Sequence, residues 1–137
     1  MNDKKLYSER WIWFASYIGG PLAGCYLMSK NFELLGKIDY AKKSFKIGIF
    51  SMALFFLGLI FVPSSIIDII PSYSLPIIYT LIIASFVKKY QGNELKEHFN
   101  SGGKKYSGWK VTGISILSLI ITLIYYLILV FVIPINY

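Results

Sequence analysis

The sequence predicts an all-α integral membrane protein, because three long stretches of the chain are uncharged or nearly so. Residues 47–87 contain one charged side chain, Asp68, and residues 111–137 and 11–29 contain none. A helix of about 20 apolar residues crosses the ~30 Å hydrocarbon core of a bilayer. We therefore expect a single transmembrane domain over residues 1–137, a bundle of four helices arranged as two helical hairpins with short cytoplasmic extensions. The expected helices span about residues 11–35, 40–63, 75–99 and 108–133.

The composition argues against several other classes of protein. Hydrophobic residues make up 55% of the chain, in blocks too long for the helices of a soluble domain. Lysine and arginine total 14 against 7 acidic residues, a net charge of +7. Since the cations lie beside the apolar blocks, we expect them to face anionic lipid headgroups, with no nucleic-acid partner. Cys25 and His98 are the only residues of their types, so we expect no internal disulfide, no zinc site and no cofactor.

The first helix, about residues 11–35, is expected to bend near its middle. Pro21 removes a backbone donor there and should kink the helix. Gly20 and Gly24 are spaced so that another helix can approach closely, either within the bundle or in a homo-oligomer. Gly36 suits the left-handed position that follows a helix and ends it.

Residues 22–25, Leu-Ala-Gly-Cys, match the lipobox of bacterial lipoproteins, and an apolar stretch with preceding cations stands before them. Cleavage before Cys25 would leave the five lysines of segment 30–46 outside the cell, against the positive-inside rule. We therefore expect Cys25 to be an unmodified, buried thiol. The alternative is a lipoprotein that begins at this cysteine.

The other helices have recognisable boundaries. The second should leave the membrane near Pro63, followed by a proline- and serine-rich hairpin at 63–75 whose only charge is Asp68. The third should begin near Pro76, because proline is tolerated in the first turn of a helix, and should continue past its apolar part. Ser107 can cap the fourth helix by accepting a backbone N–H.

Counting charges predicts the orientation. Segments 30–46 and 88–110 hold 11 of the 14 lysine and arginine residues, and the N-terminal segment holds the other 3. The positive-inside rule makes these two segments cytoplasmic in a bacterial inner membrane, with the hairpin 63–75 and both termini outside. A competing arrangement folds residues 11–29 back at 19–21 as a re-entrant hairpin. It keeps all 14 cations inside and requires other helices to shield the turn.

Two sets of short motifs resemble a group of small uncharacterised bacterial multi-pass inner-membrane proteins. The first set is Ile-Gly-Gly-Pro-Leu-Ala-Gly at 18–24, Asn-Phe at 31–32 and Leu-Gly-Lys at 35–37. The second set is Gln91, Glu97 with His98, Gly102 with Gly103, and Trp109. The resemblance implies a multi-pass fold in the inner membrane, and it implies no activity.

The densest set of polar side chains follows the third apolar block and consists of Gln91, Glu94, Glu97 and His98. Three of them, Gln91, Glu94 and His98, share one helical face by their spacing of three and four. As a cytoplasmic site, the set would transfer protons or bind an anionic group beside the lysines. As a solvated helical extension, it would only form local ion pairs, and this second interpretation is the one we expect.

Three functional hypotheses remain. The first is a non-enzymatic interaction protein, such as an immunity protein against a membrane-targeting toxin, with Asp68 as its outer-loop determinant. The second is an oligomeric channel or passive exporter that uses the glycine pair or Ser115, Ser118 and Thr122. The third is a lipid-acting enzyme that uses the polar set. We expect the first, because the central parts of the apolar helices hold no ionisable group and no catalytic motif is present.

Overall fold

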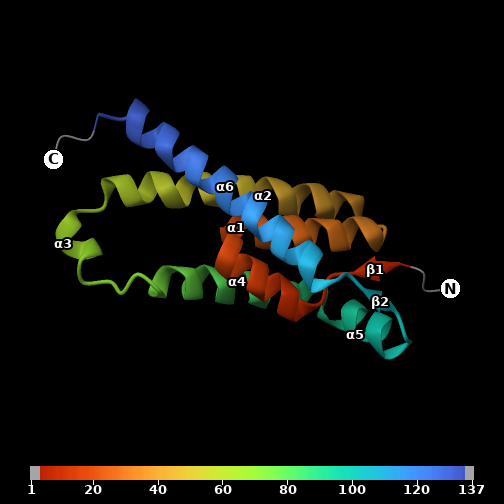
Figure 1. Ribbon diagram of the computed structural model, residues 1–137. Helices are drawn as coiled ribbons and strands as arrows, with labels where there is room; N and C mark the ends of the chain where they lie inside the picture. Colours follow the sequence, from red (N-terminus) through yellow and green to blue (C-terminus); the bar gives the residue numbers. More distant parts are fainter. Residues whose placement is uncertain (1–3, 135–137) are drawn as a thin grey trace.

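The structure is a computed structural model that describes residues 4–134, and these residues are mostly helical. The elements in chain order are β1 Lys5–Leu6, α1 Glu9–Leu34, α2 Ile38–Phe61, α3 Ser64–Ile67, α4 Ser74–Tyr90, α5 Gly92–Asn100, β2 Lys104–Lys105 and α6 Gly108–Val132. The predicted all-α class is confirmed (Figure 1).

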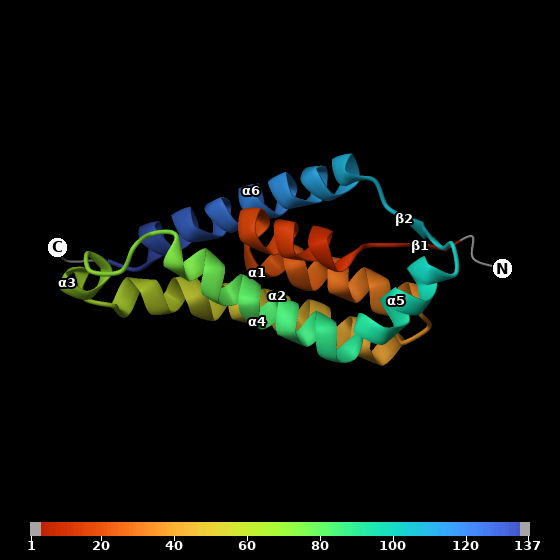
Figure 2. The same ribbon diagram turned by 90° about the horizontal axis from the view of Figure 1, so that it is seen from below.

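Helix α1 folds back on itself at Gly20, whose backbone leaves the helical region at φ 79° and ψ −174°. The backbone N–H of Tyr7 donates to Oδ1 of Asn31 at 2.8 Å. A continuous helix would separate positions 24 apart by about 36 Å. The two halves of α1, residues 9–19 and 21–34, therefore form a hairpin whose open end lies at β1 (Figure 2).

The sequence explains this fold-back. Glycine adopts a positive φ without the steric penalty of a side chain, and proline is well suited to the first position of the helix that follows. The predicted kink at Pro21 is confirmed, and it is sharp enough to divide the expected helix over 11–35 into two halves. The structure thus has the fold-back geometry that the competing arrangement requires.

The two predicted packing glycines have different roles. A side chain at Gly24 would collide with Ser16 on the other half of the hairpin, and its Cβ would lie 3.1 Å from Ile83. Apart from the adjoining backbone, a Cβ placed on Gly20 would have no heavy atom within 4 Å, so the role of this residue is in the turn. Gly19 lets α6 approach the hairpin closely, since a Cβ at this position would lie 2.9 Å from the carbonyl oxygen of Ser115. Gly24 therefore lies at a close approach of the two halves, whereas Gly20 lies at the turn between them.

The α1 hairpin is the centre of the molecule, since α2, α4 and α6 each pack extensively against it and only slightly against one another. Its buried side chains and their partners form one core. The largest fully buried apolar side chains of this core are Phe32, Leu6, Ile12, Leu27, Leu95, Val87 and Val111. Three helices that pack around one hairpin replace the predicted arrangement of two helical hairpins.

The turn between α1 and α2 has the predicted glycine. Gly36 has φ 80°, and the N–H of Lys37 donates to the carbonyl of Phe32 at 2.8 Å, the bonding pattern of a helix closed by a left-handed glycine. The cap at the start of α6 is also confirmed, since Ser107 accepts from the N–H of Lys110.

The predicted third helix, 75–99, is two helices. Helix α4 ends at Tyr90, and α5 begins at Gly92 after a non-helical Gln91 with φ −124° and ψ −14°. The short helix α3 lies in the hairpin between α2 and α4 and was not predicted. Pro76 lies in the first turn of α4, as expected.

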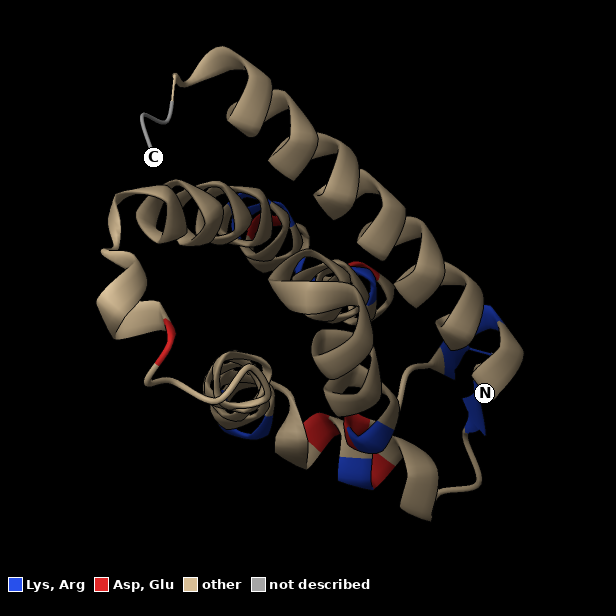
Figure 3. Cartoon of the chain, turned by 60° about the vertical axis from the view of Figure 1, so that its left-hand side comes forward, with Lys and Arg blue, Asp and Glu red and all other residues tan. Residues whose placement is uncertain are grey.

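Charge divides the molecule into two ends. Strand β1 pairs in parallel with β2, so the N-terminal segment, the α1–α2 turn, α5 and the start of α6 share one end, called the basic end below. All 14 lysine and arginine residues belong to these segments and to the adjoining ends of α2 and α4. Figure 3 shows no lysine or arginine around α3. The expectation that the N-terminal segment lies at the end opposite 88–110 is wrong, because Lys5–Leu6 pairs with Lys104–Lys105.

Two helices, α2 and α6, are long and apolar enough to cross a membrane. They run in the same direction, from the basic end toward the end that holds α3 (Figure 1). Large apolar side chains are exposed along both, including Phe50 at 64% and Phe131 at 87%.

Candidate functional site

Three buried polar residues meet at the basic end, and we call them the polar junction: Tyr7, Asn31 and Gln91. Asn31 pairs with both backbone groups of Tyr7, accepting its N–H at 2.8 Å and donating to its carbonyl at 2.9 Å. Its Nδ2 also lies 3.4 Å from Oε1 of Gln91. Nε2 of Gln91 donates to the carbonyl of Met28 at 2.8 Å. One network therefore joins the N-terminal segment, α1 and the α4–α5 break.

The polar junction is closed to solvent, because Asn31 and Gln91 are both fully buried and Tyr7 is nearly so. A buried amide without a partner destabilises a protein, whereas a satisfied network specifies one arrangement of the elements that carry it. The break at residue 91 turns the Gln91 side chain inward while its N–H still reaches the carbonyl of Val87 at 2.8 Å.

Tyr7 completes this region with its ring. The ring stacks on Tyr106, with centroids 4.3 Å apart. Burial raises the pKa of Tyr7 to about 12, and the phenol groups of Tyr106 and Tyr26 contribute to this rise, since an ionised Tyr7 would face like charge. The Tyr7 phenol is therefore neutral at physiological pH.

The remaining members of the predicted polar set lie on α5. Glu94 forms an ion pair with Lys37 of the α1–α2 turn, and both side chains are about one-third exposed. Nε2 of His98 lies 2.9 Å from the carbonyl oxygen of Lys104 and, as its N–H tautomer, donates to it. Glu97 is exposed. The expectation of a solvated extension is wrong for Gln91, because its side chain is buried. Its hydrogen-bond partner Asn31 lies 60 residues away along the chain.

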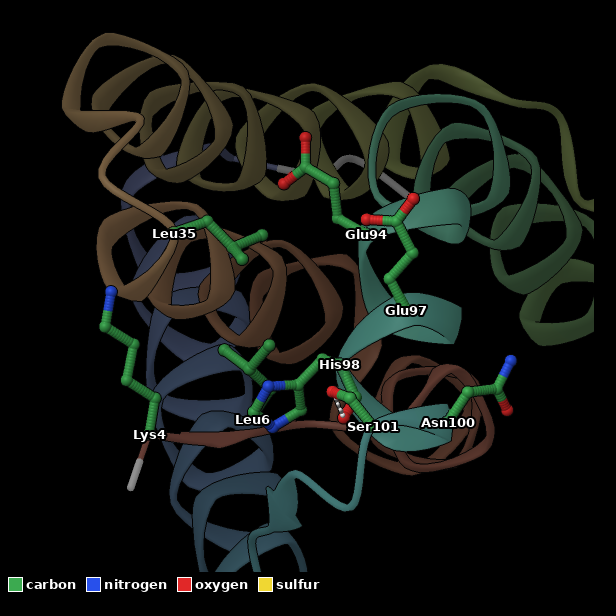
Figure 4. Close-up of a pocket in the computed structure, with 8 residues that line it drawn as sticks. All are labelled: Lys4, Leu6, Leu35, Glu94, Glu97, His98, Asn100 and Ser101. Carbon is green, nitrogen blue, oxygen red and sulfur yellow. Dashed lines mark hydrogen bonds between the residues drawn. The ribbon is translucent and has the colours of Figure 1, made fainter. Parts of the chain in front are cut away.

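An open groove of about 770 Å³ lies between these residues and the end of α1. Figure 4 shows Leu35 and Lys4 along one side and Glu94, Glu97 and His98 along the other. The residues that line it are Lys4, Leu6, Leu35, Glu94, Glu97, His98, Asn100 and Ser101. The structure thus gathers three of the four predicted polar residues around one groove, whereas Gln91 is buried in the polar junction.

The two groups of this groove best suited to proton transfer are held by internal contacts. The Glu94 carboxylate faces the Lys37 ammonium, and Nε2 of His98 is engaged with a backbone carbonyl. These contacts tie α5 to the α1–α2 turn and to β2. Among residues 4–134, no group of three or more His, Cys, Asp or Glu side chains is placed to hold a metal ion.

Two further predicted residues have clear positions. Cys25 is a free, buried thiol, and a Cβ added at Gly48 of α2 would lie 2.6 Å from its Cβ. Cleavage before Cys25 would also remove Leu6, Ile12 and Ala15, which are fully buried in the core. Asp68 is exposed at the end of α3, at the opposite end from the groove.

Sequence reasoning missed the central member of the polar junction, Asn31, and its partner Tyr7. The sequence does place an asparagine shortly after the apolar stretch 11–29. A buried side-chain amide at such a position needs hydrogen-bond partners. Its partners lie 24 and 60 residues away along the chain, and only the fold-back of α1 brings Tyr7 to it.

The chain matches no protein-family model, no curated protein sequence and no solved structure. The resemblance to a group of small bacterial membrane proteins therefore stays a prediction.

Proposed function

We propose that the chain is a bacterial inner-membrane protein that crosses the bilayer three times, with α1 as a re-entrant hairpin open to the cytoplasm. The observation that carries the proposal is the position of all 14 lysine and arginine residues at one end of the molecule. The positive-inside rule assigns that end to the cytoplasm. In this arrangement the N-terminus is cytoplasmic and the α3 hairpin is outside.

Helix α4 is the return crossing. If α2 and α6 both cross from the basic end toward α3, the chain between them has to cross back. Only α4, Ser74–Tyr90, connects the two ends, and it ends in Lys88 and Lys89 at the basic end. Its 17 residues span about 26 Å as a helix, close to the thickness of the hydrocarbon core.

The α1 hairpin fits a re-entrant position. Residues 9–19 span about 16 Å as a helix, roughly half the hydrocarbon core. Non-helical backbone such as that of Gly20 is tolerated at this depth only where protein surrounds it. Gly20 and Pro21 are both buried. The other three long helices pack around the hairpin and supply that shield.

Within the membrane, we propose that the chain acts as a non-enzymatic interaction protein, for example in immunity to a toxin that attacks the inner membrane. The contacts of Glu94 and His98 support a structural role for α5. The hairpin 63–75 presents exposed apolar side chains to the outside, including Ile69 at 80% and Tyr73 at 60%. Such a surface, with Asp68 as its only charge, suits an apolar partner at the outer face of the membrane.

A sensitive host that expresses the chain and is challenged with a toxin encoded beside its gene tests this proposal. We expect protection from the wild type and from Glu94→Ala, Glu97→Ala and His98→Ala, because α5 lies at the other end from the hairpin. Replacing hairpin 63–75 by a glycine–serine linker of equal length should abolish protection. A loss of about 10²–10⁴-fold in any alanine variant would instead support an enzyme with a general acid or base.

A channel or passive exporter is the second candidate, and the break in α1 favours it. Transporters use broken helices whose free carbonyls and N–H groups line a site near the bilayer midplane. The hydroxyl of Tyr79 donates to the carbonyl of Tyr17, close to the break, at 3.3 Å. Two predicted pore residues are otherwise engaged, Ser115 with the carbonyl of Val111 and Thr122 with Sδ of Met52. Ion flux through liposomes that contain the purified protein would replace the first proposal with this one.

A further inference from the structure

One face of α2 combines cations with an apolar groove. Lys42 and Lys46 are four residues apart, and Ile49, Phe50 and Ala53 continue the same face toward the middle of the helix. An open groove of about 540 Å³ lies here, lined by Lys46, Ile47, Ile49, Phe50 and Ala53. The face therefore runs from positive charge at the basic end to an apolar surface.

This face is separate from the one that α2 uses for packing. The buried residues of α2 are Ala41, Ser44, Gly48 and Met52, which repeat at intervals of three and four. That buried face lies against the α1 hairpin, where Gly48 meets Cys25. The groove side chains other than the half-buried Ala53 are exposed, with Ile47 at 58% and Ile49 at 44%. The groove is thus available to a molecule other than the chain itself.

We propose that this face binds one anionic phospholipid, with Lys42 and Lys46 at the phosphate and an acyl chain along Ile49, Phe50 and Ala53. The inference rests on the proposed membrane location and adds a defined ligand to it. Its support is charge complementarity, since the cations stand at the cytoplasmic level of α2 and the apolar groove extends from them into the membrane.

The position of the apolar groove directly beside the two lysines favours a lipid over free phosphate as the ligand. A free phosphate would use only the two lysines, whose side chains are exposed to water. A phospholipid also covers the apolar groove, and burial of each methylene group of its chain adds to the affinity. A basic patch that adjoins an apolar groove at the cytoplasmic level is the arrangement that recognises acidic lipid headgroups.

The experiment measures lipid binding to the purified full-length protein by native mass spectrometry. Delipidated protein is titrated with phosphatidylglycerol and, separately, with phosphatidylcholine of the same acyl chains. We expect one phosphatidylglycerol to bind at least about tenfold more tightly in the wild type than in Lys42→Gln/Lys46→Gln, because each lysine near an acidic headgroup contributes substantially to its binding. Phosphatidylcholine should not show this difference, and inorganic phosphate should not displace the lipid.

A matched control is Lys88→Gln/Lys89→Gln, which removes the same two charges from the end of α4 at the same end of the molecule. It should leave the affinity for phosphatidylglycerol within about twofold of the wild type, because these lysines lie on another helix. An equal loss in both double variants would overturn the defined site, because it would show a response to net charge alone. Displacement by inorganic phosphate would overturn the assignment to a lipid.

A third variant, Ala53→Phe, fills the groove without a change of charge. We expect it to weaken phosphatidylglycerol binding several-fold while size-exclusion chromatography shows an unchanged fold, and unaltered binding would overturn the acyl-chain position. Extraction of membranes with alkaline carbonate tests the membrane location independently of the lipid site. Release of the chain would overturn the membrane location as well, whereas retention without lipid preference would overturn this inference alone.

Discussion

Replacing Asn31 with leucine is expected to destabilise the folded protein by about 3 kcal/mol or more. Leucine has a similar size but leaves the backbone N–H and carbonyl of Tyr7 and the side-chain oxygen Oε1 of Gln91 without their partner. Each buried polar group that loses its hydrogen bond costs about 1–3 kcal/mol. Thermal unfolding in detergent, followed by circular dichroism, measures the change.

The matched control for this substitution is Asn93→Leu on α5. Asn93 is exposed, so its replacement should change the stability by less than about 0.5 kcal/mol. Equal melting temperatures for the Asn31 and Asn93 variants would show that the polar junction does not hold β1, α1 and the α4–α5 break together.

Replacing Gly24 with leucine is expected to prevent normal accumulation of the folded protein. A side chain at this position would enter the space of Ser16 on the opposite half of the α1 hairpin and meet Ile83 of α4. Inserting atoms into a packed core typically costs about 1–3 kcal/mol, and more where backbone segments have to separate. The α1 hairpin would have to open, because the added side chain would overlap Ser16, which is fully buried.

Gly58→Leu is the control for the Gly24 variant. Gly58 lies in α2, and apart from the adjoining turns of its own helix no heavy atom lies within 4 Å of the position that its Cβ would take. We expect this variant to accumulate and melt like the wild type, because leucine also has a higher helix propensity than glycine. Fluorescence-detected size-exclusion chromatography compares the two variants, and normal accumulation of the Gly24 variant would contradict the tight hairpin.

The sequence was sufficient for features that depend on local chemistry. The apolar blocks predicted α2 and α6 and the start of α4 within a few residues, and Gly36 and Ser107 have the predicted roles at helix ends. These features follow from periodicity, from a positive φ or from a side-chain oxygen beside backbone donors, and each operates within a few residues.

The features that the sequence left open depend on distant contacts. Gly-Gly-Pro at 19–21 is compatible with a kink and with a full reversal, and packing by α2, α4 and α6 decides between them. The break at Gln91 has the same origin, because its side chain turns inward to reach Met28 and Asn31 of α1. The local periodicity over 88–99 therefore could not predict this break, because the partners of Gln91 lie 60 and 63 residues away along the chain.

The side of the membrane on which the N-terminus lies is the most direct test of the re-entrant fold. Single cysteines at Lys4, Ser72 and Ser101, introduced into a Cys25→Ala background, are labelled in intact cells and in inverted vesicles with a membrane-impermeant maleimide. We predict that positions 4 and 101 label together from the cytoplasmic side and that position 72 labels from the outside. Labelling of position 4 together with position 72 would contradict the account, because α1 would then cross the membrane as a fourth span.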